Sequence, residues 1–157
     1  MQIHELRFTG HFLQRGFWLY VWEVTCPDRS KLYYVGRTGD SSSTNAQSPF
    51  NRMSQHLGHL KNSNMLRKYL KENGKTPEQC EFRLVALGPL EEESTSSDRA
   101  EHDSRRDLVA GMEKALADTM RLSGYIVMND VNSRKPLDSE RFAKVQAAFA
   151  KAFPNLK

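Results

Sequence analysis

The sequence predicts an α+β fold in which a small, mostly antiparallel three-stranded sheet is flanked by helices. Two segments dense in aromatic and β-branched residues, 17–25 and 32–36, are close enough in the chain to form an antiparallel hairpin. Most of the remaining apolar residues recur with helical spacing, and a third strand is expected only at 81–87. A length of 157 residues suits a single domain over 1–157.

Turn residues set the expected ends of the strands. The second strand is followed by a loop rich in Gly, Ser, Thr and Asn up to residue 47, and the third is expected to turn at Gly88-Pro89. Residues 125–128 are too few for more than a strand-like extension. Residues 1–16 alternate so weakly that they fit either an added edge strand or a loose arm.

Two short helices are expected after the hairpin. Ser48 and Pro49 supply an N-cap and a favoured first helical residue, and the helix should end near Gly58. A second helix should start at a Ser63 cap and end near residue 74. Its apolar residues, all expected to be buried, are Met65, Leu66, Tyr69 and Leu70.

Two further helices follow the third strand. Asp98 with Glu101 resembles a capping box, and helical spacing of apolar residues continues to Gly124. A last helix from about Ser139 belongs to a C-terminal extension, 137–157. We expect it to pack against the sheet or against another copy of the chain through one apolar stripe, formed by Phe142, Val145, Phe149 and Phe153.

The charge of the chain favours a polyanionic partner. There are 23 basic and 19 acidic side chains, which gives a net charge of +4 and a pI of about 9.1. Segment 52–75 carries six basic residues and one acid, whereas segment 90–103 carries six acids and one basic residue. Unless both are merely solvated faces, a polyanion should bind the first segment and be repelled by the second.

Several classes of protein are disfavoured. No apolar stretch is long enough to span a membrane and no secretory signal is visible, so we expect a cytoplasmic protein. Cys26 and Cys80 stand 54 positions apart, which argues against a disulfide framework and against structural zinc. The sequence contains no G-x-S-x-G, Walker A or H-E-x-x-H motif.

What remains is a pair of tyrosines followed by an arginine and a histidine. Tyr20 and Tyr34 lie on the two strands of the expected hairpin. Arg52 and His56 are four residues apart and therefore share one face of the next helix, where they can hold a phosphate and move a proton beside it. Each feature alone is more often structural, and only the combination points to chemistry.

The combination resembles the GIY-YIG endonuclease superfamily. Trp18-Leu19-Tyr20 stands where the family has G-I-Y, without the leading glycine, and Tyr34-Val35-Gly36 stands for Y-I-G. An R-x-x-x-H helix follows in the order that the family shows. Glu113 then matches the metal-binding glutamate, and Asn129 matches the closing asparagine, with Asn132 as the alternative. The resemblance covers 17–132 and implies a freestanding, single-domain nuclease.

The resemblance implies a metal-dependent endonuclease that hydrolyses phosphodiester bonds in DNA, with RNA not excluded. Glu113 would hold one Mg²⁺ or Mn²⁺ ion. Tyr20 would take a proton from the attacking water, and His56 would receive or relay it. Arg52 would neutralise the phosphate, while Tyr34 and Asn129 would position the water and the glutamate.

The position of Glu113 in its helix also bears on its role. It lies in a row with Val109, Leu116 and Met120, at the border of the apolar stripe, so its side chain should be partly buried. The structural alternative is a salt bridge from Glu113 to Arg37 or Arg52.

Arg37, directly after the second motif, is a further candidate to clamp a phosphate. The expected nucleic-acid contacts are Arg37, His59, Lys61, Arg67, Lys68 and Lys71. A homodimer through the C-terminal helix would allow cleavage of both strands. Two other functions remain open on the same fold: a catalytically inactive nucleic-acid-binding module, and an RNA-cleaving toxin or defence effector.

Overall fold

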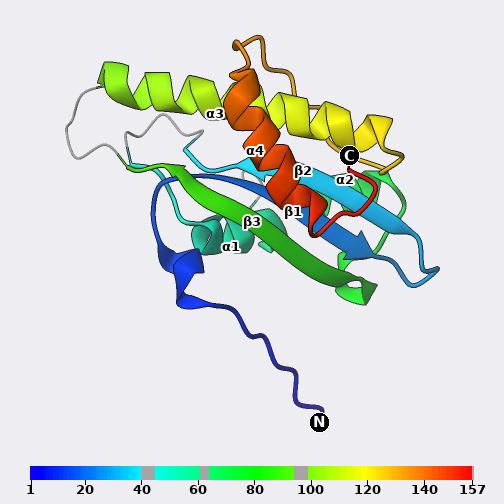
Figure 1. The fold of residues 1–157 in the computed structure, drawn as a ribbon. Coiled ribbons are helices and arrows are strands. Elements are labelled where there is room, and N and C mark those ends of the chain that lie inside the picture. Colours follow the sequence, from blue (N-terminus) through cyan, green and yellow to red (C-terminus); the bar gives the residue numbers. More distant parts are fainter. Residues whose placement is uncertain (40–44, 61–63, 94–98, 157) are drawn as a thin grey trace.

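The computed structural model describes residues 1–39, 45–60, 64–93 and 99–156. Within these ranges the chain forms an α+β fold in which helices cover both faces of one antiparallel sheet (Figure 1), which confirms the predicted fold class. The strand order is β2-β1-β3, and the strands are β1 (Phe17–Thr25), β2 (Lys31–Arg37) and β3 (Glu81–Glu91). The helices are α1 (Pro49–Leu57), α2 (Met65–Glu72), α3 (Arg99–Leu122) and α4 (Ser139–Ala150). Within these ranges no helix combines the length and apolar character needed to cross a bilayer.

The central strand β1 divides the core into two parts. Tyr20 and Trp22 point to the face that α1 and α2 cover, whereas Leu19 and Val21 point to the face that α3 and α4 cover (Figure 1). All four side chains are buried because β1 is the central strand and helices cover both faces of the sheet. The two faces of one strand therefore build two separate hydrophobic clusters.

The ends of α1 agree with the sequence prediction. The Ser48 hydroxyl accepts a hydrogen bond from the Asn51 N–H at 3.3 Å, and Gly58 follows the last turn. The other expected caps, Ser63 and Asp98, lie outside the described residues.

The strand-like extension predicted at 125–128 is present at the outer edge of β2. Val127 forms a parallel bridge with Tyr33. The Tyr33 N–H donates to the Ile126 carbonyl at 2.9 Å, and the Met128 N–H donates to the Tyr33 carbonyl at 2.8 Å. This short segment joins the end of α3 to the edge of the sheet.

The turn predicted at Gly88-Pro89 is wrong. Strand β3 continues through both residues to Glu91, which pairs with Phe17 beyond a register shift in β1. A Cβ atom on Gly88 would lie 2.7 Å from the Trp18 ring, so the glycine is needed to let this ring pack across the strand. Gly88 thus allows the Trp18 ring to pack closely against β3. From the sequence alone, a glycine needed for such packing looks the same as a glycine needed for a turn.

The predicted burial of α2 is correct for only part of the helix. Leu66 and Leu70 are fully buried, but Met65 is 37% exposed and Tyr69 is half-buried. Met65 and Tyr69 are four residues apart and share a face that lies beside the face buried in the core. Both residues line a cavity instead.

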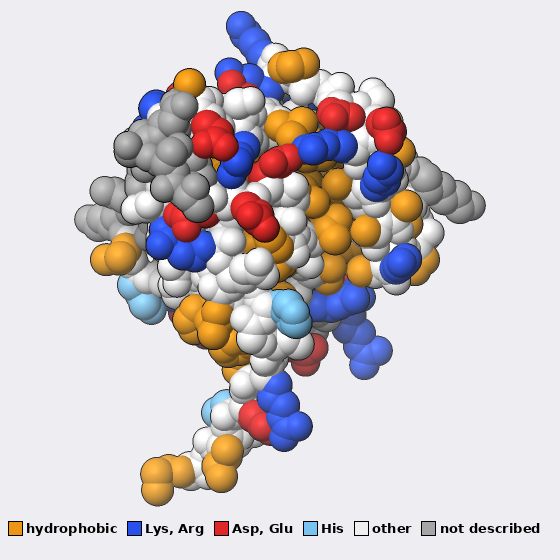
Figure 2. All heavy atoms as spheres, turned by 60° about the vertical axis from the view of Figure 1, so that its left-hand side comes forward, with side chains coloured by type: hydrophobic (Ala, Val, Ile, Leu, Met, Phe, Trp, Pro, Cys, Tyr) orange, Lys and Arg blue, Asp and Glu red, His pale blue; other side chains and the backbone are white. Residues whose placement is uncertain are grey.

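The N-terminal residues form the loose arm that was one of the two expectations. Residues 1–9 make no strand, and the short 3-10 turn Gly10–Leu13 follows them. Figure 2 shows the arm projecting from the body of the molecule. Its contact with the body includes the Phe8 and Phe50 rings, whose centroids are 5.0 Å apart.

The apolar stripe of α4 packs inside its own chain. Phe142, Val145, Phe149 and Phe153 are all at most 9% exposed and belong to the cluster on the α3 face of β1. The C-terminal extension therefore completes the core of the sheet. The stripe packs against the sheet, which was one of its two expected partners, and a homodimer through another face of the C-terminal helix stays a prediction.

This packing predicts the effect of truncating the stripe. Phe149→Ala should lower the free energy of unfolding by about 3–5 kcal/mol, because a large, fully buried ring is lost. The control is Leu122→Ala, at a position that is 89% exposed, which should change it by less than about 0.5 kcal/mol. Urea unfolding measures both; equal small effects would contradict the described packing.

Candidate active site

The two motif tyrosines meet at one histidine. Tyr20 pairs with Gly36 across the hairpin, and a Cβ atom on Gly36 would lie 2.5 Å from the Tyr20 ring. Because this glycine has no side chain, the ring can lie over β2 and reach α1. There the Tyr20 hydroxyl is hydrogen-bonded to His56 Nε2 at 2.7 Å.

His56 also contacts the second tyrosine. The Tyr34 and His56 rings are in edge-to-face contact, with centroids 4.9 Å apart. Tyr20 and His56 are each 1% exposed, and Tyr34 is 8% exposed. The imidazole is therefore enclosed between the tyrosines of the two motifs.

Burial sets the protonation states of this group. It lowers the pKa of His56 to about 3, and the nearby Arg52 charge acts in the same direction. Burial also raises the pKa of Tyr34 far above its ordinary value, and Tyr20 and Glu113 add to the rise. At neutral pH the imidazole is uncharged and the Tyr34 hydroxyl keeps its proton.

Arg52 lies one turn before His56, as the spacing predicts. Its guanidinium donates through Nη1 to Gln55 Oε1 at 3.0 Å. Its charge acts on both buried rings, lowering the pKa of His56 and opposing the rise in the pKa of Tyr34. The arginine is thus electrostatically coupled to the enclosed histidine.

Glu113 comes from the opposite face of the sheet and forms an ion pair with Arg37. Arg37 Nε donates to Glu113 Oε2 at 2.8 Å, and each side chain is 15% exposed. The partial burial of Glu113 follows the prediction from its place beside Leu116 and Met120. The salt bridge to Arg37 is the structural alternative that the sequence left open.

A polar cavity of about 520 Å³ lies beside β2 and joins several of these residues. Tyr34, Arg37, Glu113 and Asn129 line its wall. Tyr20, Arg52 and His56 are not among its lining residues. The role of Tyr20 in taking a proton from the attacking water stays a prediction, and Tyr34 is the motif tyrosine that lines this cavity.

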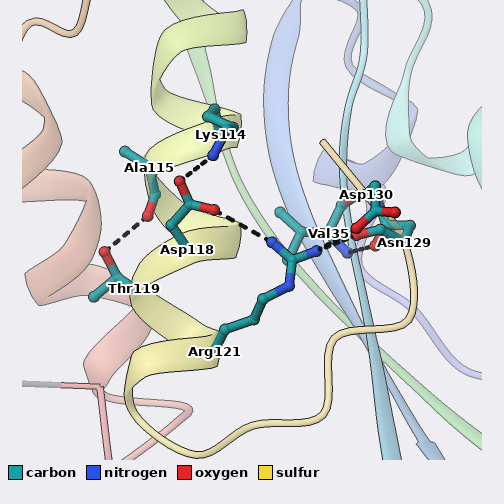
Figure 3. Close-up of polar contacts among 8 residues, drawn as sticks. All are labelled: Val35, Lys114, Ala115, Asp118, Thr119, Arg121, Asn129 and Asp130. Carbon is teal, nitrogen blue, oxygen red and sulfur yellow. Dashed lines mark hydrogen bonds and ion pairs between the residues drawn. The ribbon is translucent and has the colours of Figure 1, made fainter. Parts of the chain in front are cut away.

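Asn129 binds the backbone of strand β2 through its side-chain amide. Its Oδ1 accepts from the Val35 N–H at 3.0 Å, and its Nδ2 donates to the Val35 carbonyl at 2.7 Å (Figure 3). Arg121 on α3 binds the Asn129 carbonyl and pairs with Asp118 at 3.3 Å (Figure 3). The amide thus fixes the strand that carries Tyr34, and its part in positioning water and Glu113 stays a prediction. The alternative, Asn132, is exposed and lines the cavity.

The predicted nucleic-acid contacts are dispersed. Among them only Arg37 lines the cavity. Arg67 pairs with Glu78, and Lys68 lies 3.7 Å from Glu72. His59 and Lys71 are exposed, and Lys61 lies outside the described residues.

Sequence reasoning missed three basic residues at the cavity, Arg106, Arg134 and Lys135. Arg106 pairs with Asp103 at 2.9 Å, and Lys135 pairs with Asp107 at 2.7 Å. Figure 2 looks onto the side of the N-terminal end of α3 and shows acidic and basic side chains next to one another. The acidic surface expected from segment 90–103 is thus partly neutralised. Arg105 and Arg106 follow directly after that segment and were not counted with it.

The residues that line the cavity could hold a metal ion through Glu113. Among the described residues, no three His, Cys, Asp or Glu side chains come together as ligands. Glu113 is a carboxylate on the wall of a cavity that has room for water. This set fits an ion such as Mg²⁺, which binds through one or two carboxylates and keeps several waters. Such an ion would share the carboxylate with Arg37.

Comparisons with known proteins identify no relative: no family model, no curated protein and no solved structure matches the chain.

The buried imidazole predicts how stability depends on pH. The pKa of His56 is about 3 in the folded chain and about 6.5 when unperturbed, so the unfolded chain binds the proton first as the pH falls. Neutral His56 therefore contributes fully to the free energy of unfolding above pH 6.5. This contribution is lost as the pH falls from about 6.5 to about 3, by up to about 1.4 kcal/mol per pH unit. His56→Gln should flatten this slope in urea unfolding, whereas His59→Gln, at an exposed position, should not. Identical slopes in all three proteins would contradict the buried neutral state.

Proposed function

We propose that this protein is a metal-dependent endonuclease that hydrolyses phosphodiester bonds in DNA, as its resemblance to GIY-YIG nucleases implies. One observation carries the proposal: Tyr34 of the second motif connects the R-x-x-x-H helix to the cavity that Glu113 lines. Its ring contacts His56 of α1, and it lines the same cavity as Glu113 of α3. Residues far apart in the sequence thus form one continuous group.

The buried pair supports proton transfer. The Tyr20 hydroxyl and His56 Nε2 share a 2.7 Å hydrogen bond. Burial keeps the imidazole a weak base, so it can accept the hydroxyl proton only once entering water relieves that burial. The phenolate oxygen so formed can take a proton from the attacking water. Because both side chains are 1% exposed, water reaches them only when the packing around Tyr34 opens.

The remaining residues supply charge and orientation. The Arg37 guanidinium lies at the cavity wall, where it can neutralise a phosphate oxygen. Tyr34, which keeps its proton, can donate a hydrogen bond to the same phosphate. Glu113 would hold the metal ion, which when bound stabilises negative charge on the phosphate and on the leaving oxygen.

An inactive nucleic-acid-binding module is the second candidate. The observation that favours it is the burial of Tyr20 and His56, since a hydrogen bond between two buried side chains can be purely structural. The two candidates differ in whether DNA is cut. RNA cleavage is tested by including RNA of the same sequence as a substrate.

Plasmid nicking tests the proposal. The wild type should nick supercoiled DNA with Mg²⁺ and stop with EDTA, and Glu113→Gln should slow nicking at least about 100-fold, because the ion loses its carboxylate. Glu140→Gln is the matched control, since this glutamate is exposed and paired only with Lys144 in the described contacts. If wild type binds DNA without cutting any form of it, the binding-module function is favoured. Equal activity of both variants would remove Glu113 from the site.

A hydroxyl deletion separates catalysis from stability. Tyr20→Phe should cost about 0.5–1.5 kcal/mol of stability through the lost hydrogen bond. It should also slow nicking about 100-fold or more, because the proton acceptor is lost. Tyr33→Phe makes the same change on the other face of the sheet and should leave the rate unchanged. A Tyr20→Phe protein with normal nicking would show that this hydrogen bond is structural only.

A further inference from the structure

The cavity has an apolar side that the proposed hydrolysis does not use. Met65 and Tyr69 line it from α2, although helical spacing would place them in the core. Met65 is 37% exposed. The Tyr69 ring is held against Tyr34, with centroids 5.9 Å apart and an interplanar angle of 53°. An aromatic ring with an apolar neighbour therefore borders the wall that carries Tyr34.

The other sides of the cavity are polar and carry charges of both signs, because Asp107 and Asp130 line it beside three basic residues. Arg106 reaches it from α3, and Arg134 and Lys135 come from the segment between α3 and α4. Arg134 is exposed and has no ion-pair partner among the described residues. Asn132, also exposed, contributes an amide that can donate and accept hydrogen bonds. Helices α2 and α3 cover opposite faces of the sheet (Figure 1), so the cavity is lined by residues from both faces.

We propose that the cavity takes one unpaired nucleotide next to the scissile phosphate, so that the preferred DNA has an unpaired segment beside the cleavage site. This preference presupposes the nuclease function proposed above. Tyr69 stacks on the base with Met65 beside it, Asn132 contacts the base edge, and Arg134 binds the adjoining phosphate.

The chemistry of the cavity favours an unpaired base over a base pair. Its volume of about 520 Å³ lies in the range of about 300–1,000 Å³ that encloses small molecules. A base in a duplex has both faces stacked and its pairing edge occupied, so it can offer neither to Tyr69 nor to Asn132. An unpaired base offers both, and stacking on an aromatic ring contributes to binding of every base type.

Fluorescence anisotropy in EDTA tests this preference without cleavage. The probes are a labelled DNA duplex, the same duplex with a short unpaired flap, and the labelled single strand as DNA and as RNA. Wild type should bind the flapped duplex more tightly than the plain duplex. Tyr69→Leu should weaken binding to the flapped and single-stranded probes at least about fivefold and leave the plain duplex unchanged. Tyr69→Phe, which keeps the ring, should bind all probes as the wild type does.

A second substitution keeps the test valid if Tyr69→Leu fails to fold. Met65→Thr, at an exposed position, should reduce the preference for the flapped duplex in the same direction. Arg134→Gln should weaken binding to every probe and reduce its salt dependence, because a phosphate contact is lost.

Three results would overturn the proposal: equal wild-type affinity for plain and flapped duplexes, equal losses on both probes in Tyr69→Leu, or tighter binding of single-stranded RNA of the same sequence. Failure of the nuclease function gives a different result. In that case the flap preference and its dependence on Tyr69 persist in EDTA, while no substrate is nicked when Mg²⁺ is added.

Discussion

The buried hydrogen bond between Tyr20 and His56 is the contact on which the site depends. It ties the central strand to α1 in a place where neither partner reaches solvent. An uncharged imidazole is the form that tolerates such burial, because an isolated charge there would lose its hydration. The bond also requires the missing side chain of Gly36, since a methyl group would occupy the space of the phenol ring. The pairing of β1 with β2, the position of α1 and the neutral state of His56 thus all depend on this one contact.

A second constraint acts from the other face of the sheet. Arg121 and Asn129 connect the end of α3 to the backbone of Val35, next to Tyr34 (Figure 3). Glu113 lies on the same helix, so the carboxylate and the tyrosine are positioned relative to one another through a few buried contacts. Tyr34 therefore contacts the enclosed histidine and also lines the open cavity.

The sequence predicts the elements better than it predicts their contacts. Strand β1 and helix α1 follow from local signals, namely aromatic density and the Ser48 cap, and both agree with the structure. The partners of Asn129 could not be predicted, because they lie 94 residues away in the chain. Burial of Tyr20 depends on the packing of α1 and α2 over the sheet. Met65 was expected in the core because helical spacing shows which apolar residues lie near one another on a helix. It does not show which of two neighbouring faces packs against the core.

The segment that follows α3 has a further consequence for the edge of the sheet. Strand β2 is at the margin of the sheet, where unpaired N–H and C=O groups would invite another chain to add a strand. Residues 126–129 occupy these groups at Tyr33 and Val35 through backbone and amide hydrogen bonds. At these positions the edge of β2 is therefore closed to strand addition. A nucleic acid bound along this edge would contact side chains and not unpaired backbone groups.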